Sequence, residues 1–205
     1  GRITMADVYN LVLEGLDEKV YREISKALVA IAEDVNFNKH NKATVTGFDE
    51  AEFDRLIATA DAYGKSTIYC TYEIAAQVAP QNANNGINWE AFSGNMKDER
   101  WNNGYFTRYK GHSVIVLPQS FEDVSNAVKV LDPAYAWIIP TGAEKPVKIA
   151  FEGSAAVREH ENADWSREIQ TYKKLGVAVY SVNPGICVFK NTNLSINNTA
   201  GTWGN

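Results

Sequence analysis

Apolar residues near the start of the chain recur every three or four positions, and they do so from Met5 to Val35 without an intervening proline. This period is typical of an amphipathic α-helix, and Thr4 in front of it is a suitable N-cap. Such a helix would be roughly 45 Å long at 1.5 Å per residue. Because the apolar stripe lacks a sustained 3.5-residue spacing, the pattern favours a strut lying across a sheet over a coiled coil.

The middle of the chain alternates short helical and extended patterns. The clearest local signal is Lys110-Gly111, a turn dipeptide between an aromatic segment and the apolar run Ser113–Leu117, which predicts a β-hairpin. The expected elements in this region are a helix over 49–63, a strand and short helix over 65–80, a surface loop over the Asn-rich 81–88, a partly helical segment over 89–101, the hairpin over 103–118, and a helix over 121–131 that Ser120 caps.

The last third is dominated by extended patterns. WIIPTGAEKPVKIAFEG, residues 137–153, reads as two extended segments joined by a turn that contains Thr-Gly. The second segment alternates apolar Val147, Ile149 and Phe151 with polar neighbours, as a half-buried strand does. Further strands are expected over 157–160, 177–180 and 186–189, residues 166–175 fit helix or strand, and residues 191–205 read as a loose tail. One long helix, a mixed middle and a strand-rich end together predict the α+β class.

Composition narrows the function classes. The chain has 205 residues, of which 45% are hydrophobic and 22% charged, enough for one domain or two small ones. Its net charge of −5 argues against strong non-specific nucleic-acid binding. Cys70 and Cys187 match no disulfide or zinc spacing, so a reducing compartment is the default. We find no run of about 18 apolar residues, and therefore expect no membrane span. The Gly-Arg start is consistent with a processed or truncated product.

Motifs for catalysis are sparse in the sequence. His40, His112 and His160 are widely spaced and have no HExxH or CxxC companion, so we expect no metal site and no cofactor. No Gly-rich phosphate loop follows a strand, and no GxSxG nucleophile motif occurs. Cys187 lies in an apolar strand pattern, where a thiol behaves as a small hydrophobe.

One charged cluster leaves several interpretations open. It contains Arg158, Glu159, His160 and Arg167, together with nearby acidic residues. Glu159 beside His160 could pair for proton transfer. Equally, the cluster could contact another subunit, or it could be a solvated face. The residues alone do not separate these three readings, although we expect intersubunit contact.

The succession of patterns resembles a known family. GYFTRYKGHSVIVLP resembles the hairpin of tailed-phage major capsid proteins with the HK97-type fold. WIIPTGAEKPVKIAFEG is similar to the paired strands of their peripheral domain, and REIQTYKKLGVAVYSVNPGICVFK is similar to their closing strands. The resemblance covers residues 4–190 in order, and the first helix would be the family's spine helix. The family has an arm and an extended loop before this helix, whereas the sequence begins almost at the helix, so we expect a version truncated at the N-terminus.

The resemblance implies a shell protein with two domains. Residues 4–42 and 134–174 would form a peripheral-type domain, and residues 43–133 and 175–190 an axial-type domain. The chain would self-assemble into hexamers and pentamers of an icosahedral shell, made in the bacterial host cytoplasm and found in the virion. Its partners would be itself, scaffolding and portal proteins, and packaged DNA through weak contacts. The expected intersubunit residues are Arg158, Glu159, His160, Arg167, Asn82, Asn84 and Asn85.

Two other function classes stay open at this point. The first is a small hydrolase or transferase with Glu159 and His160 as its polar centre. The second is an adaptor that binds a partner through the Asn-rich loop 81–88. The shell-protein reading predicts no catalytic residues at all.

Overall fold

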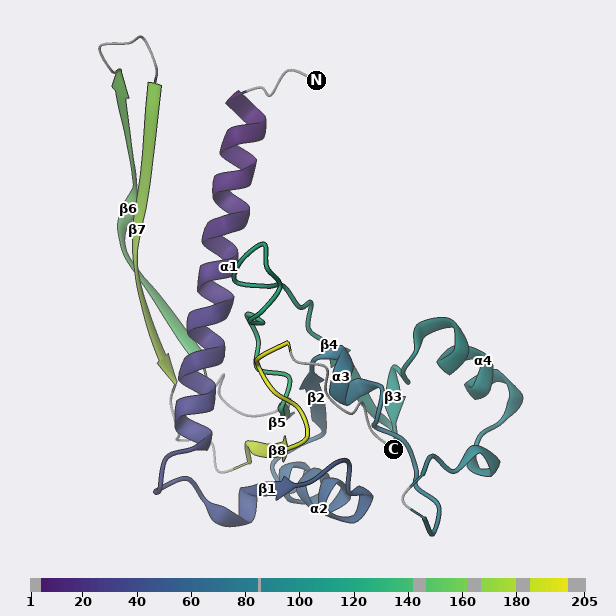
Figure 1. Cartoon of the computed structure of the whole chain (residues 1–205). Helices are drawn as coiled ribbons and strands as arrows, with labels where there is room; N and C mark the ends of the chain where they lie inside the picture. Colours follow the sequence, from purple (N-terminus) through teal and green to yellow (C-terminus); the bar gives the residue numbers. More distant parts are fainter. Residues whose placement is uncertain (1–4, 85, 142–146, 162–166, 180–184, 199–205) are drawn as a thin grey trace. The chain divides into compact units, whose positions relative to one another are not determined.

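Two compact units make up the chain. A computed structural model describes residues 5–84, 86–141, 147–161, 167–179 and 185–198 (Figure 1). One unit comprises residues 1–28 and 145–180, and the other comprises residues 29–144 and 181–205. The helical N-terminal segment is therefore grouped with a segment more than a hundred residues later in the sequence. We describe each unit by itself.

The first unit contains most of the long helix and a long hairpin. Helix α1 spans Met5–Ala32, so its 28 residues correspond to roughly 42 Å. It ends three residues before the predicted Val35, because the Asp34 carboxylate accepts a hydrogen bond from the Asn36 backbone N–H at 2.7 Å. An Asp that bonds the backbone two residues ahead forms a turn in place of continued helix.

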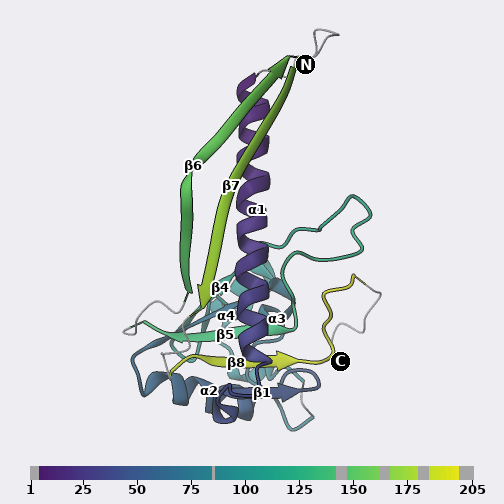
Figure 2. The same ribbon diagram turned by 90° about the vertical axis from the view of Figure 1, so that its left-hand side faces the viewer.

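The hairpin pairs β6, Val147–Glu161, with β7, Arg167–Val179, in antiparallel register. Its register runs from Val147 opposite Val179 to Glu161 opposite Arg167 and shifts between Glu152 and Ala156. Figure 2 shows β6 bending along its length, as a strand with a bulge does. Of the ambiguous segment 166–175, the described residues 167–175 are thus strand.

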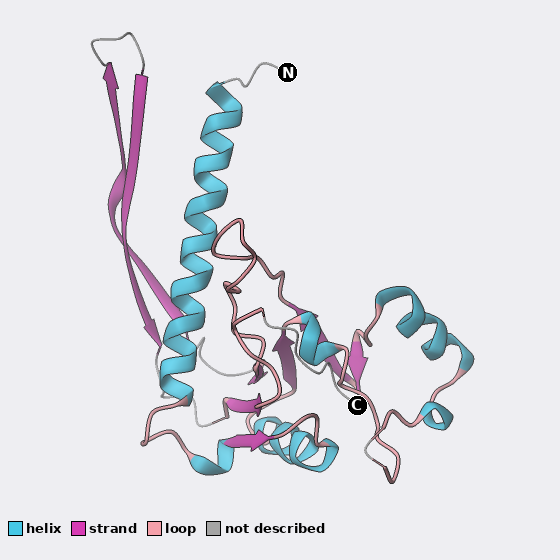
Figure 3. Cartoon of the chain, viewed as in Figure 1, coloured by secondary structure: helices cyan, strands magenta, loops and turns pink. Residues whose placement is uncertain are grey.

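The second unit is built on a six-stranded mixed sheet with the order β1-β8-β5-β2-β4-β3. The pairs β1–β8 and β2–β4 are parallel, and the other three pairs are antiparallel. The chain is therefore of the α+β class with a mixed sheet (Figure 3). The strands are β1 Lys42–Val45, β2 Ser66–Cys70, β3 Arg108–Tyr109, β4 His112–Val116, β5 Tyr135–Pro140 and β8 Cys187–Asn191.

Short helices accompany this sheet. They are η1 Lys39–Asn41, α2 Glu50–Asp61, α3 Tyr72–Ala75, η2 Trp89–Ala91 and α4 Gly94–Asn103. Helix α2 begins where predicted, because the Asp49 carboxylate accepts from the Glu52 backbone N–H at 3.0 Å. Its apolar side packs on the sheet, with the Phe53 ring edge-on to Phe189 at 5.1 Å between ring centroids. This packing forms the main core of the unit.

The central strand β5 is buried on both faces. Ala136 and Ile138 are fully buried in the core beneath α2, while the rings of Tyr135 and Trp137 are buried on the alternate positions. A strand covered on both faces reads as a continuous apolar run, which explains the pattern of residues 135–139.

Two predictions were wrong, one for the pairing of the extended segments after residue 136 and one for residues 120–131. The segments 137–139 and 147–151 do not pair with each other: the first pairs with β2 and β8, and the second with β7. Residues 120–131 form an irregular loop in place of the predicted helix. There the Gln119 side chain bonds both the N–H and the C=O of Leu131, at 3.0 and 2.8 Å, and Asn126 has a φ of 54°. Such side-chain-to-backbone bonds compete with helix formation.

Residues 191–198, which the sequence analysis placed in a loose tail, are hydrogen-bonded to the second unit. The buried Asn191 side chain accepts from the Gly47 backbone N–H and donates to Gln77, both at 2.9 Å. Further along, the Ile196 carbonyl accepts from the Lys129 backbone N–H at 2.9 Å. This segment therefore belongs to the folded part of the unit. Residues 199–205 lie outside the described ranges.

Candidate functional site

The four charged residues expected at an intersubunit contact lie on the hairpin. Arg158, Glu159 and His160 are in β6, with Gln170, Ile169 and Glu168 of β7 as their register partners. Arg167 is the first residue of β7 and is opposite Glu161. The register therefore brings the four positions together near one end of the hairpin. Glu159 and His160 are consecutive strand positions, and consecutive positions belong to opposite faces of a sheet.

The Asn-rich loop is held by its own side chains. The Asn82 carboxamide oxygen accepts from the backbone N–H groups of Asn84 and Gly86, both at 3.0 Å. Asn84 is exposed, whereas Asn85 lies outside the described residues. The Asn82 side chain therefore maintains the loop conformation, while Asn84 is accessible to a partner.

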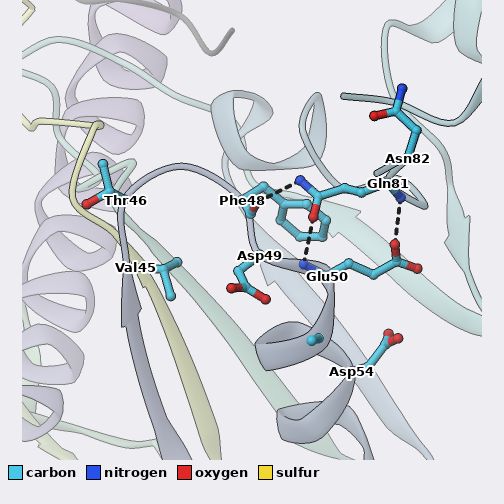
Figure 4. A pocket seen from close by; sticks show the side chains of 9 residues that line it. Val45, Thr46, Phe48, Asp49, Glu50, Asp54, Gln81 and Asn82 are labelled. Carbon is cyan, nitrogen blue, oxygen red and sulfur yellow. Dashed lines mark hydrogen bonds between the residues drawn. The ribbon is translucent and has the colours of Figure 1, made fainter. Parts of the chain in front are cut away.

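Gln81 fastens this loop to the start of α2. Its backbone N–H donates to the Glu50 carboxylate at 2.6 Å, and its side-chain oxygen accepts from the Glu50 backbone N–H at 3.0 Å (Figure 4). The Gln81 side-chain amide also donates to the Phe48 carbonyl at 2.7 Å. One of these bonds satisfies the backbone N–H of Glu50, which lies in the first turn of α2 and has no partner within the helix. The other two connect the loop to the Glu50 side chain and to Phe48, which precedes the helix. Nothing in the local sequence indicates this contact, because its partners are 31 to 33 residues apart.

An open acidic pocket lies beside this junction. It has a volume of about 730 Å³. Three carboxylates line it, those of Asp49, Glu50 and Asp54, together with the partly buried Phe48 and the exposed Ala51 (Figure 4). Below the acidic rim, Phe48 packs on the main core, with its ring 5.2 Å from that of Phe53. The pocket therefore combines the partly buried Phe48 ring with a mostly polar, negatively charged lining.

A single lysine bridges two of these carboxylates. The Lys110 ammonium, at the turn of the β3–β4 hairpin, pairs with Glu50 at 2.7 Å and also with Asp54. Partial burial acts to raise the pKa of Glu50, but hydrogen bonds from Lys110 and from the Gln81 backbone outweigh it, so this pKa lies below its usual value. Asp54 also accepts from the Tyr109 hydroxyl at 3.0 Å. One bound ammonium thus leaves the three-carboxylate rim net negative.

Three residues of the second unit resemble a catalytic triad in composition only. The His112 ring nitrogens lie 3.2 Å from the Ser66 hydroxyl and 3.4 Å from the Asp61 carboxylate. However, Ser66 is 1% exposed, and its hydroxyl bonds to Asp61 at 2.8 Å. A nucleophile must be activated by its base and reach a substrate. This cluster instead fixes the end of α2 to strands β2 and β4.

The cysteines do not offer a nucleophile either. Burial raises the pKa of both the Cys70 and the Cys187 thiols to about 12. Because the thiolate is the reactive form, both thiols are inert at neutral pH. Among the residues that the structure describes, no group of three or more His, Cys, Asp and Glu side chains could hold a metal ion.

A hub on Glu33 joins the end of α1 to three neighbouring strands. One carboxylate oxygen of Glu33 accepts from Lys42 of β1 at 2.9 Å, Tyr135 of β5 at 2.8 Å and Lys190 of β8 at 3.0 Å. The hydrogen bond from Lys42 is the largest influence that lowers the pKa of Glu33 to about 2. Lys42 also donates to the Ala32 carbonyl at 2.8 Å, which caps the helix C-terminus. Sequence reasoning missed this hub, because its members are up to 157 residues apart.

A comparison with protein families identifies the family of this chain. The chain belongs to the YonB family, described as "SPbeta prophage-derived putative capsid protein YonB", which matches residues 2–183. No curated protein and no solved structure matches the chain. In the described part of the chain, no helix is long and apolar enough to cross a membrane. Family membership therefore supports a phage capsid protein, in agreement with the coarse part of the predicted resemblance.

Proposed function

We propose that this protein is a structural subunit of an icosahedral phage shell with an HK97-type fold, and that it self-assembles into hexamers and pentamers around DNA. The family supports a structural capsid role with self-association. The observation that carries the finer proposal is the β6–β7 hairpin. Its strands of 15 and 13 residues pair with each other and, among the described residues, with no other strand.

Two long strands with unpaired outer edges are suited to pairing with another chain. Isolated two-stranded hairpins are marginally stable in water, and a further strand or a packed neighbour stabilises them. Strand addition satisfies the backbone groups along an open edge. A neighbouring subunit in a shell supplies such a contact at every position of the lattice.

The sheet of the second unit, by contrast, has guarded edges. Beside β1, the Arg55 guanidinium donates to the carbonyl of Lys42, the first residue of this strand, at 3.3 Å, and to the carbonyl of His40 in η1 at 2.6 Å. The opposite edge is β3, which has only two residues. Short edge strands and charged side chains on an edge are devices that prevent strand addition. Association by strand pairing is therefore directed to the hairpin.

Further parts of the proposal follow from the same assignment. Helix α1 serves as the spine, residues 4–42 and 134–174 as the peripheral-type domain, and residues 43–133 and 175–190 as the axial-type domain. Scaffolding and portal proteins are the expected assembly partners. Weak contact with DNA is consistent with the net charge of −5. The proposed intersubunit residues are Arg158, Glu159, His160, Arg167, Asn82, Asn84 and Asn85.

The alternative of a hydrolase or transferase is less well supported. Glu159 and His160 occupy consecutive positions of β6, which belong to opposite faces of the hairpin. A general base and its partner must share a substrate face. The adaptor reading has no observation that favours it, since Asn82 of the loop is committed to internal hydrogen bonds.

Shortening the hairpin tests the shell proposal. Residues 153–173 would be replaced by Asn-Gly, a two-residue turn that joins the directly paired positions Glu152 and Lys174. We expect the variant to retain the second unit, as judged by an unchanged unfolding transition, but to lose the particles that the parent chain forms in negative-stain electron microscopy. A Glu159→Ala/His160→Ala double variant in the parent chain serves as the test of the enzyme alternative. Shells of normal yield from the shortened chain would overturn the proposed role of the hairpin.

A further inference from the structure

The helix α4 presents an unusual surface. None of its residues is buried, and the Trp101 side chain is 90% exposed. Figure 1 shows α4 to the side of the sheet, within the segment that connects α3 to β3. Trp is large and apolar, so full exposure of its ring to water is unfavourable and marks a contact surface when it recurs with other apolar groups. Met96 on the same helix is also exposed, but it is five residues from Trp101 and therefore lies on a different face.

The rest of this segment is fixed, which makes α4 a rigid support for Trp101. The Arg100 guanidinium lies 5.2 Å from the centre of the Phe106 ring and also donates to the Ala76 carbonyl at 2.5 Å. At the C-terminal end, Gly104 adopts a φ of 78° and donates its backbone N–H to the Arg100 carbonyl at 2.7 Å. A side chain such as Trp101 that is carried on a rigidly positioned helix loses little conformational entropy when it binds a partner.

A lysine accompanies the exposed indole. Lys97 is four residues before Trp101, so the two side chains are neighbours on one face of the helix. The side chain of Lys97 is exposed and makes no ion pair with any residue in the described ranges. One face of α4 therefore offers an aromatic ring and an uncompensated positive charge.

The acidic pocket at the start of α2 has complementary chemistry. It offers the Phe48 ring within a lining whose three carboxylates and one bound ammonium leave it net negative. Its volume of about 730 Å³ lies within the range of roughly 300–1,000 Å³ that is usual for ligand pockets. Aromatic anchors in apolar pockets contribute most of the binding energy at protein interfaces, and complementary charges set the partner and the register.

We infer that Trp101 of one copy inserts into the acidic pocket of a second copy, with Lys97 pairing to the carboxylate of Asp49. This inference rests on the proposed shell function and supplies a specific contact for it. The two surfaces are different, so the contact is head-to-tail. A head-to-tail contact closes into a ring or propagates as a filament, whereas a self-complementary contact stops at a dimer. Rings of this kind are the units from which a shell of hexamers and pentamers is built.

Two single variants disable one side of the contact each. Trp101→Ala removes the anchor and leaves the pocket intact, while Ala51→Arg fills the pocket and leaves the anchor intact. Ala51 is exposed in the first turn of α2, so a longer side chain is accommodated there without loss of the core. We expect each variant to weaken self-association at least about 30-fold, the loss typical of a buried aromatic anchor. Lys97→Glu is a third variant that retains Trp101, and it should weaken association in a salt-dependent manner.

The decisive measurement is a mixing experiment by two-colour sedimentation velocity with the full chain. Labelled Trp101→Ala and unlabelled Ala51→Arg chains should bind each other more tightly than either binds itself, because the mixture restores one intact anchor–pocket junction. Val124→Ser is the matched control, since Val124 is fully exposed on the unrelated loop 120–131 and its loss should change nothing.

The remaining outcomes separate this inference from the shell function. If the parent chain forms oligomers and both single variants do so equally well, the anchor–pocket contact is wrong and the shell proposal stands. If both variants are weakened but the mixture is no tighter, the contact is not head-to-tail and the inference fails. If the parent chain stays monomeric at every concentration, both the inference and the proposed self-assembly fail.

Discussion

A buried ion pair between Glu73 and Lys129 gives the sharpest prediction about the second unit. Glu73 is in the first turn of α3, and Lys129 is at the end of the irregular loop 120–131. Their charged atoms are 3.0 Å apart, and their side chains are only 7% and 10% exposed. The second Glu73 oxygen, Oε2, is buried without a hydrogen-bond partner among the described residues. Removing Lys129 would therefore leave a buried carboxylate with little compensation.

The expected magnitude follows from this burial. Removing one partner of a buried pair costs about 3–5 kcal/mol, because the remaining charge stays desolvated, whereas replacing both partners by apolar groups is close to neutral. We expect Lys129→Met to lower the free energy of unfolding by about 3–5 kcal/mol and Glu73→Leu by a similar amount. The double variant should return to within about 2 kcal/mol of the parent chain.

Urea unfolding followed by tryptophan fluorescence measures these differences. The matched control is Lys26→Met, the same change in the exposed pair of Lys26 and Glu23, whose side chains are 57% and 50% exposed. Exposed pairs contribute about 0–1 kcal/mol, so the control should shift the midpoint little. The reasoning is refuted if Lys129→Met unfolds at the parent midpoint, or if the double variant is as unstable as the sum of the singles.

Three further predictions test other parts of the chain. Glu33 has its pKa lowered from 4.5 to about 2, so its contribution to stability is complete above pH 4.5 and is lost as the pH falls towards 2. Because its side chain is 41% exposed, solvent screening reduces this contribution to about 1 kcal/mol. Glu33→Gln should lower the free energy of unfolding in urea by that amount at pH 7 and make it depend less on pH between 4.5 and 2. An unchanged pH dependence in this range would contradict the role of the hub. Arg55→Ala frees two carbonyls beside β1, and we expect faster aggregation by light scattering than for the exposed control Lys39→Ala. Gly104→Ala combines an unfavourable φ of 78° with overlap on the Tyr72 hydroxyl, so its unfolding free energy should fall by more than about 1 kcal/mol, whereas Gly94→Ala, which meets open space, should be tolerated.

Elements with strong local signals could be predicted from the sequence. The periodic stripe that begins at Met5 predicted α1, Asp49 predicted the start of α2, and Lys110-Gly111 predicted the turn between β3 and β4. Each of these signals acts over a few residues, through helix periodicity, capping or turn conformation. The α+β class followed from the order of these elements.

Features that depend on distant partners could not be predicted. The apolar segment at 137–139 reads as a strand, but nothing in it specifies β2 and β8 as its neighbours rather than residues 147–151. The Glu33 hub and the Gln81 contact with Glu50 likewise join residues far apart in the sequence. The prediction of a helix over 121–131 failed for a different reason, because the Gln119 side chain bonds to backbone groups that a helix would have used.

The central claim is that this chain builds a shell, and electron microscopy of the purified full chain over a concentration series tests it most directly. We predict closed particles, or at least rings with five- and six-fold symmetry, whose yield rises with concentration and falls on shortening the β6–β7 hairpin. A chain that remains monomeric under all conditions, or that forms only amorphous aggregates, would contradict the account.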